Sequence, residues 1–284
     1  MGFDESFVQD VKALHLDVGK MMDNPGSAMS SLLILMPALI QQFYNQEKTK
    51  YFAKSPHPPR HNEAFDYIIV GGGAAGSVLA NRLSTESNNF KVLLLEAGGP
   101  PLQPSIIPGA GFFGIGGNGT DWLFESTKQN VSSRAVKTYK LPLFQGKGLG
   151  GSTLESLLVH MRGSPEIYDD WAKLVNDESW NNLNLKRFFK KSENYRGTYP
   201  DSEEIHGCSG EFPVEKTRYT PKPFLFEAAK ENNFAINDVT VPVTSVYGRA
   251  DSPIHSSIQY NAYTSFVKPI LHRKNLKIQP YAEV

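Results

Sequence analysis

Hydrophobic and polar positions change period twice between residues 65 and 99. The run FDYIIV (residues 65–70) is β-branched and aromatic and ends at a glycine, which predicts a strand. Residues 74–84 carry apolar side chains at helical spacing, and the nearly continuous apolar run KVLLLEAGG (residues 91–99) is typical of a parallel strand buried on both faces. Together they predict a strand–helix–strand unit, and with it an α/β fold.

Downstream of residue 99 the pattern predicts shorter elements around a second glycine-rich segment. Strands are expected at DWLFES (121–126), after the HG turn (206–215) and at LKIQPYAEV (276–284). Helices are expected at the end of GKGLGGSTLESLLVHMRG (146–163), at residues 164–174, 184–195 and 222–234, and from residue 256 up to the last strand. The proline-rich stretch KSPHPPRHNEA (54–64) is typical of a linker. Because the sequence stops within an apolar strand, we expect it to be a portion of a longer protein.

Composition removes several functional classes. Lys and Arg together number 29, as do Asp and Glu, so no net charge favours binding to nucleic acid or to an anionic membrane. Cys208 is the only cysteine and can form neither an internal disulfide nor a cysteine-based metal site. The linker histidines have no second ligand pair at metal spacing, so we predict no metal site.

The most apolar run is SSLLILMPALI (residues 30–40). It is too short to span a bilayer, and a proline interrupts it. The charged residues before it are mostly acidic, unlike the start of a signal peptide, which favours a helix that is buried or docks a partner. The sequons at Asn118 and Asn130 would accept glycans in a secreted chain, but the sequence does not predict a compartment.

Three glycines, Gly71, Gly73 and Gly76, form the spacing G-x-G-x-x-G at the predicted strand-to-helix turn. In a dinucleotide-binding unit the first permits the tight turn, the second leaves room for a pyrophosphate, and the third lets the helix lie close to the strand. The helix N-terminus offers free N–H groups to the phosphates. Glu96 follows twenty residues after Gly76, where a carboxylate can accept hydrogen bonds from ribose hydroxyls. These features predict a dinucleotide site.

The second glycine loop, GKGLGGST (residues 146–153), bears on which dinucleotide is bound. Glu96 disfavours the 2′-phosphate of NADP, which leaves FAD and NAD. A second loop of backbone N–H groups and hydroxyls suits a long cofactor held at both ends. Locally, the same residues also fit a flexible loop and a helix cap, with Ser152 or Thr153 and Glu155 forming a capping box. The local pattern leaves both interpretations open.

Seven motifs, in order along the chain, resemble one family of flavoproteins. They are FDYIIVGGGAAGSVLANRLS, KVLLLEAGG, DWLFES, GKGLGGSTLESLLVHMRGSPEIYDDWA, FFKKSENYRG, HGCSGEFPV and AYTSFVKPILHRKNLKI, and they begin at about Asp66. In this order they resemble the glucose–methanol–choline (GMC) flavin oxidoreductases, in particular the insect branch with glucose dehydrogenases and ecdysone oxidases. The resemblance implies a Rossmann-like FAD-binding fold of the GMC type, incomplete here, with the start of an α+β substrate domain.

The resemblance also implies FAD as the cofactor and assigns residues to it. The three glycines of the first loop would face the pyrophosphate, Glu96 the ribose, residues 146–156 the isoalloxazine side, and the backbone of Val284 the adenine. The complete set of expected cofactor-binding residues is Gly71, Gly73, Ala74, Ala75, Gly76, Glu96, Ala97, Gly146, Leu149, Gly150, Ser152, Thr153, Ser156 and Val284.

The chain departs from the family pattern at several positions. Ser156 stands where asparagine is usual, Glu155 where the family has an apolar residue, and Gln145 where it has arginine. The catalytic histidine of the family and its His or Asn partner lie near the end of a longer chain, so no catalytic residue is predicted in this one. We expect none of the histidines His160, His206, His255 and His272 to act as the base. The first two are expected to be structural.

The resemblance predicts four segments and one activity. The segments are an N-terminal helical segment and linker (1–62), the first part of the FAD-binding domain (63–163), the start of the substrate domain with its covering helices (164–245) and a return to the FAD-binding domain (246–284). The activity is oxidation of an alcohol of sugar or sterol type to a carbonyl, with hydride transfer to flavin N5 and electrons passed to oxygen or a quinone. The alternatives are an inactive truncated isoform and a nicotinamide-dependent dehydrogenase.

Overall fold

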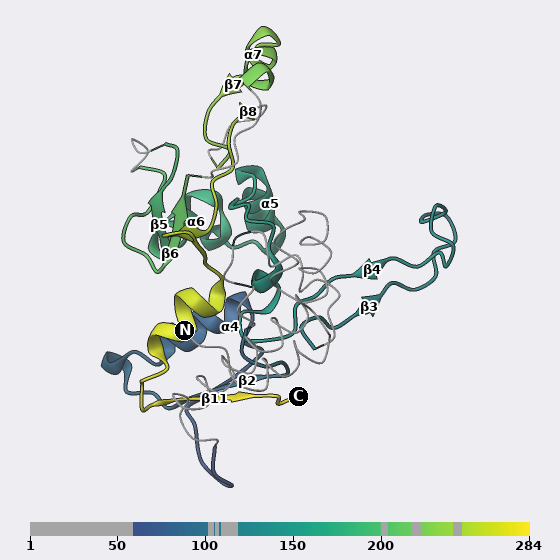
Figure 1. Cartoon of the computed structure of the whole chain (residues 1–284). Coiled ribbons are helices and arrows are strands. Elements are labelled where there is room, and N and C mark those ends of the chain that lie inside the picture. The colour runs from purple at the N-terminus through teal and green to yellow at the C-terminus, as the bar shows by residue number, and fades with distance from the viewer. Residues whose placement is uncertain are drawn as a thin grey trace, which may run out of the picture.

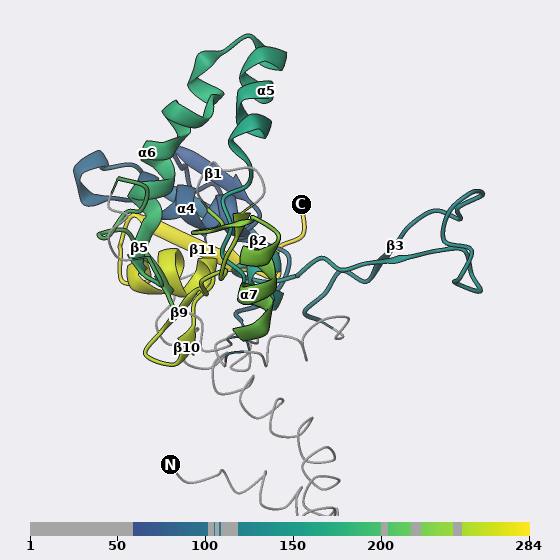
Figure 2. The same cartoon turned by 90° about the horizontal axis from the view of Figure 1, so that it is seen from above.

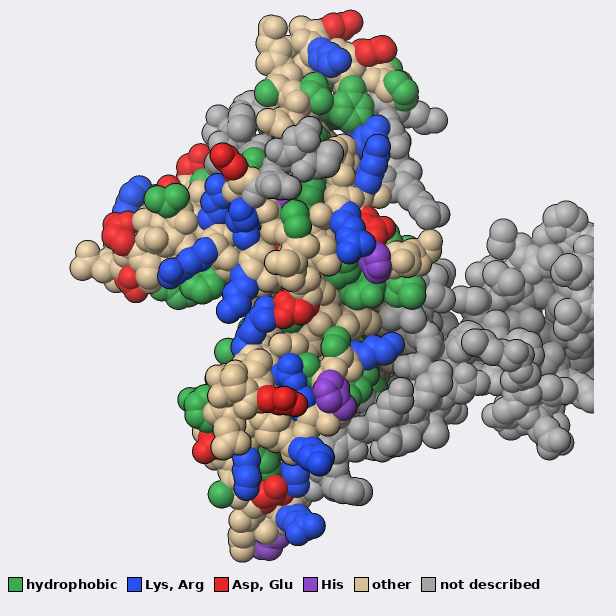
Figure 3. Space-filling model, turned by 90° about the vertical axis from the view of Figure 1, so that its left-hand side faces the viewer, with side chains coloured by type: hydrophobic (Ala, Val, Ile, Leu, Met, Phe, Trp, Pro, Cys, Tyr) green, Lys and Arg blue, Asp and Glu red, His purple; other side chains and the backbone are tan. Residues whose placement is uncertain are grey.

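A computed structural model of the chain describes residues 59–101, 105, 108, 119–199, 204–216, 223–240 and 246–284. The apolar run at residues 30–40, residues 54–58 of the linker and Asn118 of the first sequon lie outside these ranges. Within them, no helix has both the length and the hydropathy needed to cross a bilayer. On the face drawn in Figure 3, Lys and Arg side chains are interspersed with Asp and Glu side chains.

A three-stranded parallel sheet lies at the centre, in the order β1 (Tyr67–Val70), β2 (Val92–Glu96) and β11 (Leu276–Pro280). Both outer strands pair with β2, and Val92 lies opposite Tyr67 on one side and Leu276 on the other. Helix α4 (Ala74–Leu83) connects β1 to β2 and packs on both (Figure 1). The strand–helix–strand unit predicted from the periodicity is confirmed, and the fold class is α/β with a parallel sheet.

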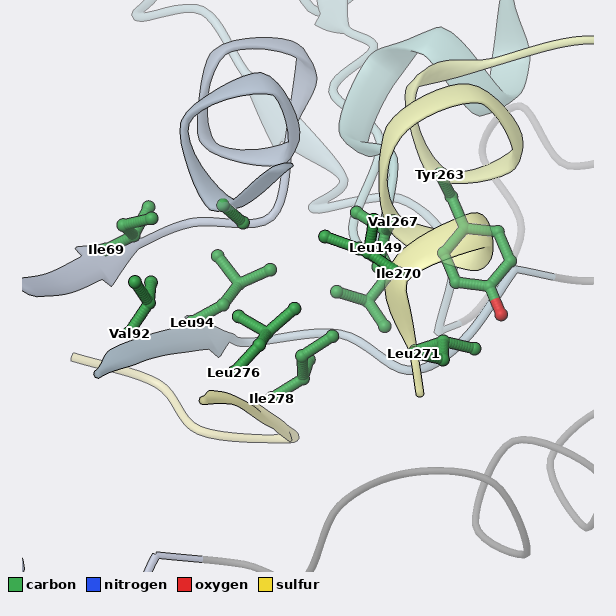
Figure 4. Packing of buried hydrophobic residues seen from close by; sticks show 11 residues of the cluster. Ile69, Val92, Leu94, Leu149, Tyr263, Val267, Ile270, Leu271, Leu276 and Ile278 are labelled. Atoms are coloured by element: carbon green, nitrogen blue, oxygen red, sulfur yellow. The ribbon is translucent and has the colours of Figure 1, made fainter. Parts of the chain in front are cut away.

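The main hydrophobic core lies between this sheet and the helical turns that precede β11 (Figure 4). Its members come from α4, the three strands, the second glycine loop and those turns: Ile69, Ala80, Val92, Leu94, Leu149, Tyr263, Val267, Ile270, Leu271, Leu276 and Ile278. Each fully buried Leu or Ile contributes about 1.5–3 kcal/mol through removal of apolar surface from water. Because Leu149 belongs to this cluster, the core also fixes the second glycine loop against the sheet.

Residues 165–247 form smaller units around this core. Helices α5 (Pro165–Val175) and α6 (Asn182–Ser192) are joined by the 3₁₀ turn η5 (Glu178–Trp180). Strand β5 (Glu193–Arg196) pairs in parallel with β6 (Phe212–Glu215). An arm with α7 (Pro223–Glu231), β7 (Ala235–Ile236) and β8 (Val246–Tyr247) extends from the body at the top of Figure 1. The predicted helices at 164–174 and 222–234 are confirmed with small changes of bounds.

A long two-stranded ribbon, residues 121–146, leaves the body where Asp121 pairs with Gly146, the first residue of the second glycine loop (Figure 1). Its strands β3 (Phe124–Glu125) and β4 (Pro142–Leu143) are only two residues each, so most of the predicted strand DWLFES is not regular strand. Further backbone hydrogen bonds continue the pairing on either side, from Ser126 N–H to Leu141 O and from Gln129 N–H to Tyr139 O, each 2.9 Å long.

The helix predicted at the end of residues 146–163 is wrong. The chain forms only the 3₁₀ turn η4 (Gly151–Glu155), and at Ser156, with ψ of 148°, it becomes extended. Tertiary contacts account for the extended path, because His160 N–H donates to Asp251 O at 2.9 Å and the Arg162 guanidinium pairs with Glu193. A helix over these residues would break both contacts.

Two further predicted helices are shorter than expected. The helix at 184–195 ends at Ser192, because Glu193 turns into β5 and buries its carboxylate. The stretch from 256 contains the hairpin of β9 (Ile254–His255) and β10 (Ile258–Gln259), then the π-helical turn η6 (Tyr263–Val267) and the 3₁₀ turn η7 (Lys268–Ile270). The predicted last strand is confirmed as β11, but it ends at Pro280. The remaining short element is the 3₁₀ turn η1 (Glu86–Asn88).

Candidate functional site

The bend between β1 and α4 is formed by Gly71 and closed by Gly76. Gly71 has φ of +94°, a left-handed conformation that glycine adopts without strain, and its N–H donates to Leu95 O at 2.8 Å. A Cβ on Gly76 would lie 1.9 Å from Gly71 O, so only glycine allows α4 to approach the bend this closely. The first and third glycines of the motif therefore shape the protein itself.

Gly73, the second glycine of the motif, faces open space. Its φ of −71° is ordinary, and the nearest atom to a Cβ built on it would be Gly151 Cα at 4.0 Å. Gly73 is also the N-cap of α4, which has no side-chain cap and no acidic residue in its first turn. The first-turn N–H groups and the positive end of the helix dipole are thus available to an anion above Gly73.

The carboxylate of Glu96 is aimed at this bend. Its Oε2 accepts a hydrogen bond from Gly72 N–H at 2.6 Å, and its Oε1 accepts one from Gly98 N–H at 2.8 Å. The side chain is 6% exposed, so these two amides hold it in a defined orientation. Each carboxylate oxygen has a second lone pair left for another donor.

The second glycine loop packs directly on the first. Gly150 N–H donates to Gly72 O at 2.7 Å, and a Cβ on Gly151 would lie 2.8 Å from Gly73 Cα. No side chain caps η4, so of the two interpretations left open by the sequence the one with a capping box is wrong. The Thr153 hydroxyl instead accepts a hydrogen bond from Ala262 N–H at 3.0 Å. These contacts exclude the flexible-loop interpretation and make the two loops one wall.

Between the two loops and the end of β11 lies an open cleft of about 500 Å³. It is lined by nine of the fourteen expected cofactor residues, namely Gly71, Gly73, Ala74, Glu96, Ala97, Gly146, Ser152, Thr153 and Val284. The other five, Ala75, Gly76, Leu149, Gly150 and Ser156, do not line it. Among these, Gly76, Leu149 and Gly150 shape the walls through the contacts described above.

The last residues of the chain reach the cleft because β11 pairs with β2. Beyond the end of β11, Tyr281 N–H donates to Gly98 O at 3.0 Å and Ala282 N–H to Glu96 O at 2.9 Å. This lays residues 282–284 along the edge of the cleft beside Glu96. The position of Val284 therefore depends on a pairing between residues 184 apart in the sequence, such as Val92 and Leu276.

Two lining residues, Trp122 and Gln145, were not expected from the sequence. They face each other at the root of the ribbon, where Trp122 N–H donates to Gln145 O at 2.9 Å. The Trp122 ring stacks with Phe124 at 5.6 Å between centroids and lies 4.2 Å from Lys147 Nζ. Gln145 Nε2 donates to Ser152 Oγ at 3.0 Å and orients that hydroxyl. What brings both residues to the cleft is the pairing of the two sides of the ribbon. The sequence predicted a strand at DWLFES but not the strand with which it pairs.

The arrangement fits a dinucleotide. The helix end and open Gly73 suit a pyrophosphate, Glu96 suits a ribose, and no side chain fills the space over Gly73. A profile of the GMC oxidoreductases matches residues 65–284. The chain belongs to the GMC oxidoreductase family. Members of this family bind FAD.

Individual GMC relatives agree with this assignment. Glucose dehydrogenase [FAD, quinone] of Drosophila melanogaster is 30% identical over 255 residues, which cover 89% of this chain and 40% of the relative. Ecdysone oxidase of Bombyx mori is 39% identical over 191 residues, which cover 64% of this chain and 28% of the relative. The chain therefore spans at most about 40% of the length of these curated relatives.

Solved structures show the same fold. Pyridoxine 4-oxidase from Mesorbium loti superposes with a TM-score of 0.63 and 25% identity, over 77% of this chain and 42% of that one. Formate oxidase superposes with a TM-score of 0.66 and 24% identity, over 78% of this chain and 39% of that one. The parallel sheet, α4 and the return of β11 are thus the FAD-binding fold of GMC proteins.

Glu155, a departure from the GMC pattern, lies at the end of the turn that lines the cleft. Burial, with a contribution from the charge of Asp121, raises the pKa of Glu155 to about 7. Its Oε1 is buried and has no hydrogen-bond partner. The side chain does not itself line the cleft. A carboxyl group in this position is held largely neutral below pH 7.

The histidines considered from the sequence lie away from the cleft of this GMC chain. His206 is buried between Glu193 Oε2, 3.0 Å from its Nδ1, and Asp238 Oδ2, 2.6 Å from its Nε2. His160 Nε2 lies 3.0 Å from Glu193 Oε1, and His255 Nδ1 lies 2.5 Å from Glu215 Oε1. Among the described residues, no histidine lines the cleft.

Proposed function

We propose that this GMC chain binds FAD in the cleft between its two glycine loops and contributes that site to an oxidoreductase that converts alcohols to carbonyls. The observation that carries the proposal is the Glu96 carboxylate, fixed by Gly72 N–H at 2.6 Å beside an open, uncapped helix N-terminus. A carboxylate for the ribose and free amides for the phosphates are thereby held a few residues apart.

Each end of the cleft has a distinct role in this proposal. At one end, Glu96 accepts hydrogen bonds from the ribose hydroxyls, and the backbone at Val284 meets the adenine. In the middle, Gly73 and the first turn of α4 receive the pyrophosphate. At the other end, Ser152, whose hydroxyl is oriented by Gln145 Nε2 at 3.0 Å, lies along the isoalloxazine side.

A flavin held in this cleft would supply the redox chemistry, as the acceptor of a hydride from the alcohol carbon. The residues of this chain bind and orient the cofactor, and the second loop keeps one wall of the site rigid. We assign the base that removes the hydroxyl proton to none of the described residues. His206 is committed to two carboxylates at 3.0 and 2.6 Å and lies outside the cleft.

The substrate proposed is an alcohol of sugar or sterol type, and the acceptor is oxygen or a quinone. The similarity to a glucose dehydrogenase [FAD, quinone] and to an ecdysone oxidase supports these two classes. The aligned region of each relative is less than half of its length, so the substrate class rests on family membership rather than on a pocket in this chain.

A flavin titration with a spectral readout tests the proposal. The purified full chain is mixed with FAD, and binding is followed by the visible flavin bands and by quenching of flavin fluorescence; NAD serves as the control ligand. We expect FAD to bind and NAD not to compete. Binding of NAD in place of FAD would favour a nicotinamide-dependent dehydrogenase.

A second step separates cofactor binding from catalysis. Glucose and ecdysone are added in turn, without oxygen, to the FAD-loaded chain. Bleaching of the flavin bands by either alcohol shows an active enzyme with that substrate class. Bound flavin that neither alcohol bleaches would support the alternative of a chain that holds the cofactor but lacks activity.

A further inference from the structure

The ribbon (residues 121–146) exposes apolar side chains that the described chain does not cover. It is a two-stranded sheet, and Figures 1 and 2 show it projecting from the body in both views. Phe124, Leu141 and Leu143 are about half exposed, and Val131, near the tip, is 83% exposed. A two-stranded hairpin is marginally stable in water without a further strand or helix against it. Of the four residues, Val131 lies in the outer half of the ribbon, and no described residue covers it.

The outer half of the ribbon, residues 127–140, is uniformly basic. It carries Lys128, Arg134, Lys137 and Lys140, all exposed, and contains no Asp or Glu. One of them, Lys140, pairs with Glu125 nearer the body at 3.3 Å. Three cations are thus left without an acidic neighbour in this half of the ribbon, so the surface that it contacts is expected to be acidic.

The helix α5 and the turn η5 present an acidic and apolar face. Ile167, Trp171 and Leu174 follow one another at helical spacing and all are exposed, Leu174 by 84%. Residues 165–180 carry five exposed acidic side chains and a single cation, Lys173. Apolar side chains at this spacing on a solvent-facing helix mark an interaction surface.

We propose that the chain forms a two-fold dimer in which the outer half of the ribbon of each copy packs on the α5–η5 face of the other. The two surfaces match chiefly in charge, which is positive on the outer half of the ribbon and negative on the α5–η5 face. The apolar side chains that the outer half adds are the exposed Val131 and Tyr139. The two-fold axis makes the contact twice, so both ribbons and both helix faces are covered.

The size and the overall charge of the molecule support this partner. The outer half of the ribbon and the α5–η5 face together contain about thirty residues of each copy, from which a contact of the size of a stable interface could be drawn. The formal net charge is zero, so no long-range repulsion between copies opposes association. In Figure 2 the ribbon and the α5–α6 pair project from the body in different directions, so the ribbon of one copy is free to meet α5 of another.

The main competing surface is α6, which is also basic. It carries Arg187 and Lys191, both exposed, beside the exposed Leu183 and Phe188. It could complement α5 of a second copy without using the ribbon. The test must therefore distinguish cations on the ribbon from cations on α6.

Charge-reversal variants measured by sedimentation velocity distinguish the cations of the ribbon from those of α6. The ribbon variant is Arg134→Glu/Lys137→Glu, the helix variant is Glu166→Lys/Asp170→Lys, and the matched control is Arg187→Glu/Lys191→Glu, which changes net charge as the ribbon variant does. We expect wild type and control to be dimers. The ribbon and helix variants should each dissociate at least tenfold more readily, and an equimolar mixture of the two should restore a dimer.

A cross-linking measurement covers the case in which a variant folds poorly. In a Cys208→Ser background, Val131→Cys and Leu174→Cys chains are mixed and treated with a flexible bismaleimide, and a heterodimer band is expected only in the mixture. The proposal is overturned by a wild type that is monomeric at 50 mM salt, by a dimer indifferent to the ribbon variant, or by loss of the dimer in the α6 control.

Discussion

At the residue scale, Gly73 and Gly76 of the same motif have different roles. Gly76 lies where a Cβ would be 1.9 Å from Gly71 O, so its absence of a side chain is a requirement of packing. Gly73 lies where a Cβ would meet nothing closer than 4.0 Å, so the protein alone does not require glycine there. The proposed phosphate site, rather than the packing of the chain, gives glycine a role at this position.

Substituting these two glycines separates folding from cofactor binding. We expect Gly73→Ala to change the free energy of unfolding by less than about 1 kcal/mol but to weaken FAD binding at least tenfold, because the methyl group occupies the phosphate position. Gly76→Ala should destabilise the fold by about 3 kcal/mol or more through the clash with Gly71 O. Chemical denaturation and flavin fluorescence quenching measure the two effects; unimpaired FAD binding by Gly73→Ala would contradict the proposed site.

Glu155 predicts a pH dependence of stability. Its pKa in the folded chain is about 7, above the value of 4.5 for an unperturbed carboxyl, so the folded state binds more protons between these values. Stability therefore falls as pH rises through this window. We expect Glu155→Gln to raise the free energy of unfolding by about 1–2 kcal/mol at pH 8, after allowance for partial solvent screening, and to leave it unchanged at pH 4.

Denaturation of wild type and Glu155→Gln at both pH values checks this expectation. Glu231→Gln, which removes an exposed acid on α7, is the matched control and should have no effect at either pH. An equal gain at both pH values for Glu155→Gln would show that packing, and not ionisation, is responsible.

The sequence identified some site residues and not others for a physical reason. Gly71, Gly73 and Glu96 lie within one strand–helix–strand unit, whose geometry is set by neighbours in the sequence. Trp122 and Gln145 reach the cleft only because the two sides of the ribbon pair. Their contribution depends on that non-local contact, which periodicity does not encode.

At the scale of elements, a buried charge network joins β5, the HG turn and the α7 arm. Glu193, the first residue of β5, contacts the Arg162 guanidinium, His160 Nε2 and His206 Nδ1. On its other side His206 contacts Asp238, which follows β7 of the arm, and its ring stacks on Tyr195 at 3.5 Å. A charged His206 therefore binds the base of the arm to the body.

The network predicts that the arm loosens at alkaline pH. Despite burial, hydrogen bonds to Asp238 and Glu193 raise the pKa of His206 above its ordinary value of 6.5. Its contribution to stability is fully present below 6.5 and is lost as pH rises through the folded pKa. We expect Asp238→Asn to cost about 3 kcal/mol at pH 6 and to flatten this dependence, because the imidazolium loses one of its two carboxylates.

Hydrogen exchange of residues 223–240 measures this effect locally. Wild type should show faster exchange in this segment at pH 9 than at pH 6, after correction for the intrinsic rates, whereas Asp238→Asn should show fast exchange at both. Protection in β2 serves as the internal control and should not change. A pH-independent arm in wild type would contradict the role assigned to His206.

Elements were predictable from the sequence where local pattern and tertiary contacts agree. The β1–α4–β2 unit satisfies both, since the order strand, helix, strand that its hydrophobic pattern predicts matches a parallel sheet that packs against α4. Residues 157–163 have apolar residues that fit a helix, but the pairing of Arg162 with Glu193 holds them extended. Residue Glu193 likewise leaves the predicted helix because its carboxylate is buried among partners from other segments.

At the scale of the whole molecule, one core supports both walls of the cleft. Leu149 from the second loop, Ile69 from β1 and Leu276 from β11 belong to the same buried cluster. A ligand that bridges the two loops and the end of β11 therefore binds the folded chain alone, and its binding energy adds to the stability of the entire sheet.

This coupling predicts a ligand-dependent unfolding transition. FAD at 100 times its dissociation constant should raise the free energy of unfolding by about 2.7 kcal/mol, as expected for one site that is absent in the unfolded state. Thermal denaturation with and without FAD measures the shift. Gly73→Ala, which leaves the core intact, should show a much smaller shift, and an equal shift in both would place FAD elsewhere.

The direct contact between the two glycine loops restricts how a cofactor enters. The loops are joined by the hydrogen bond from Gly150 N–H to Gly72 O, 2.7 Å long, and by the close approach of Gly151 to Gly73. They therefore do not separate from each other to admit a ligand. The cleft is open to solvent, and the ion pair of Lys147 with the exposed Glu283 at its rim, 3.9 Å long, is too weak to close it. A nucleotide would therefore enter and leave through this open side, without any separation of the two loops.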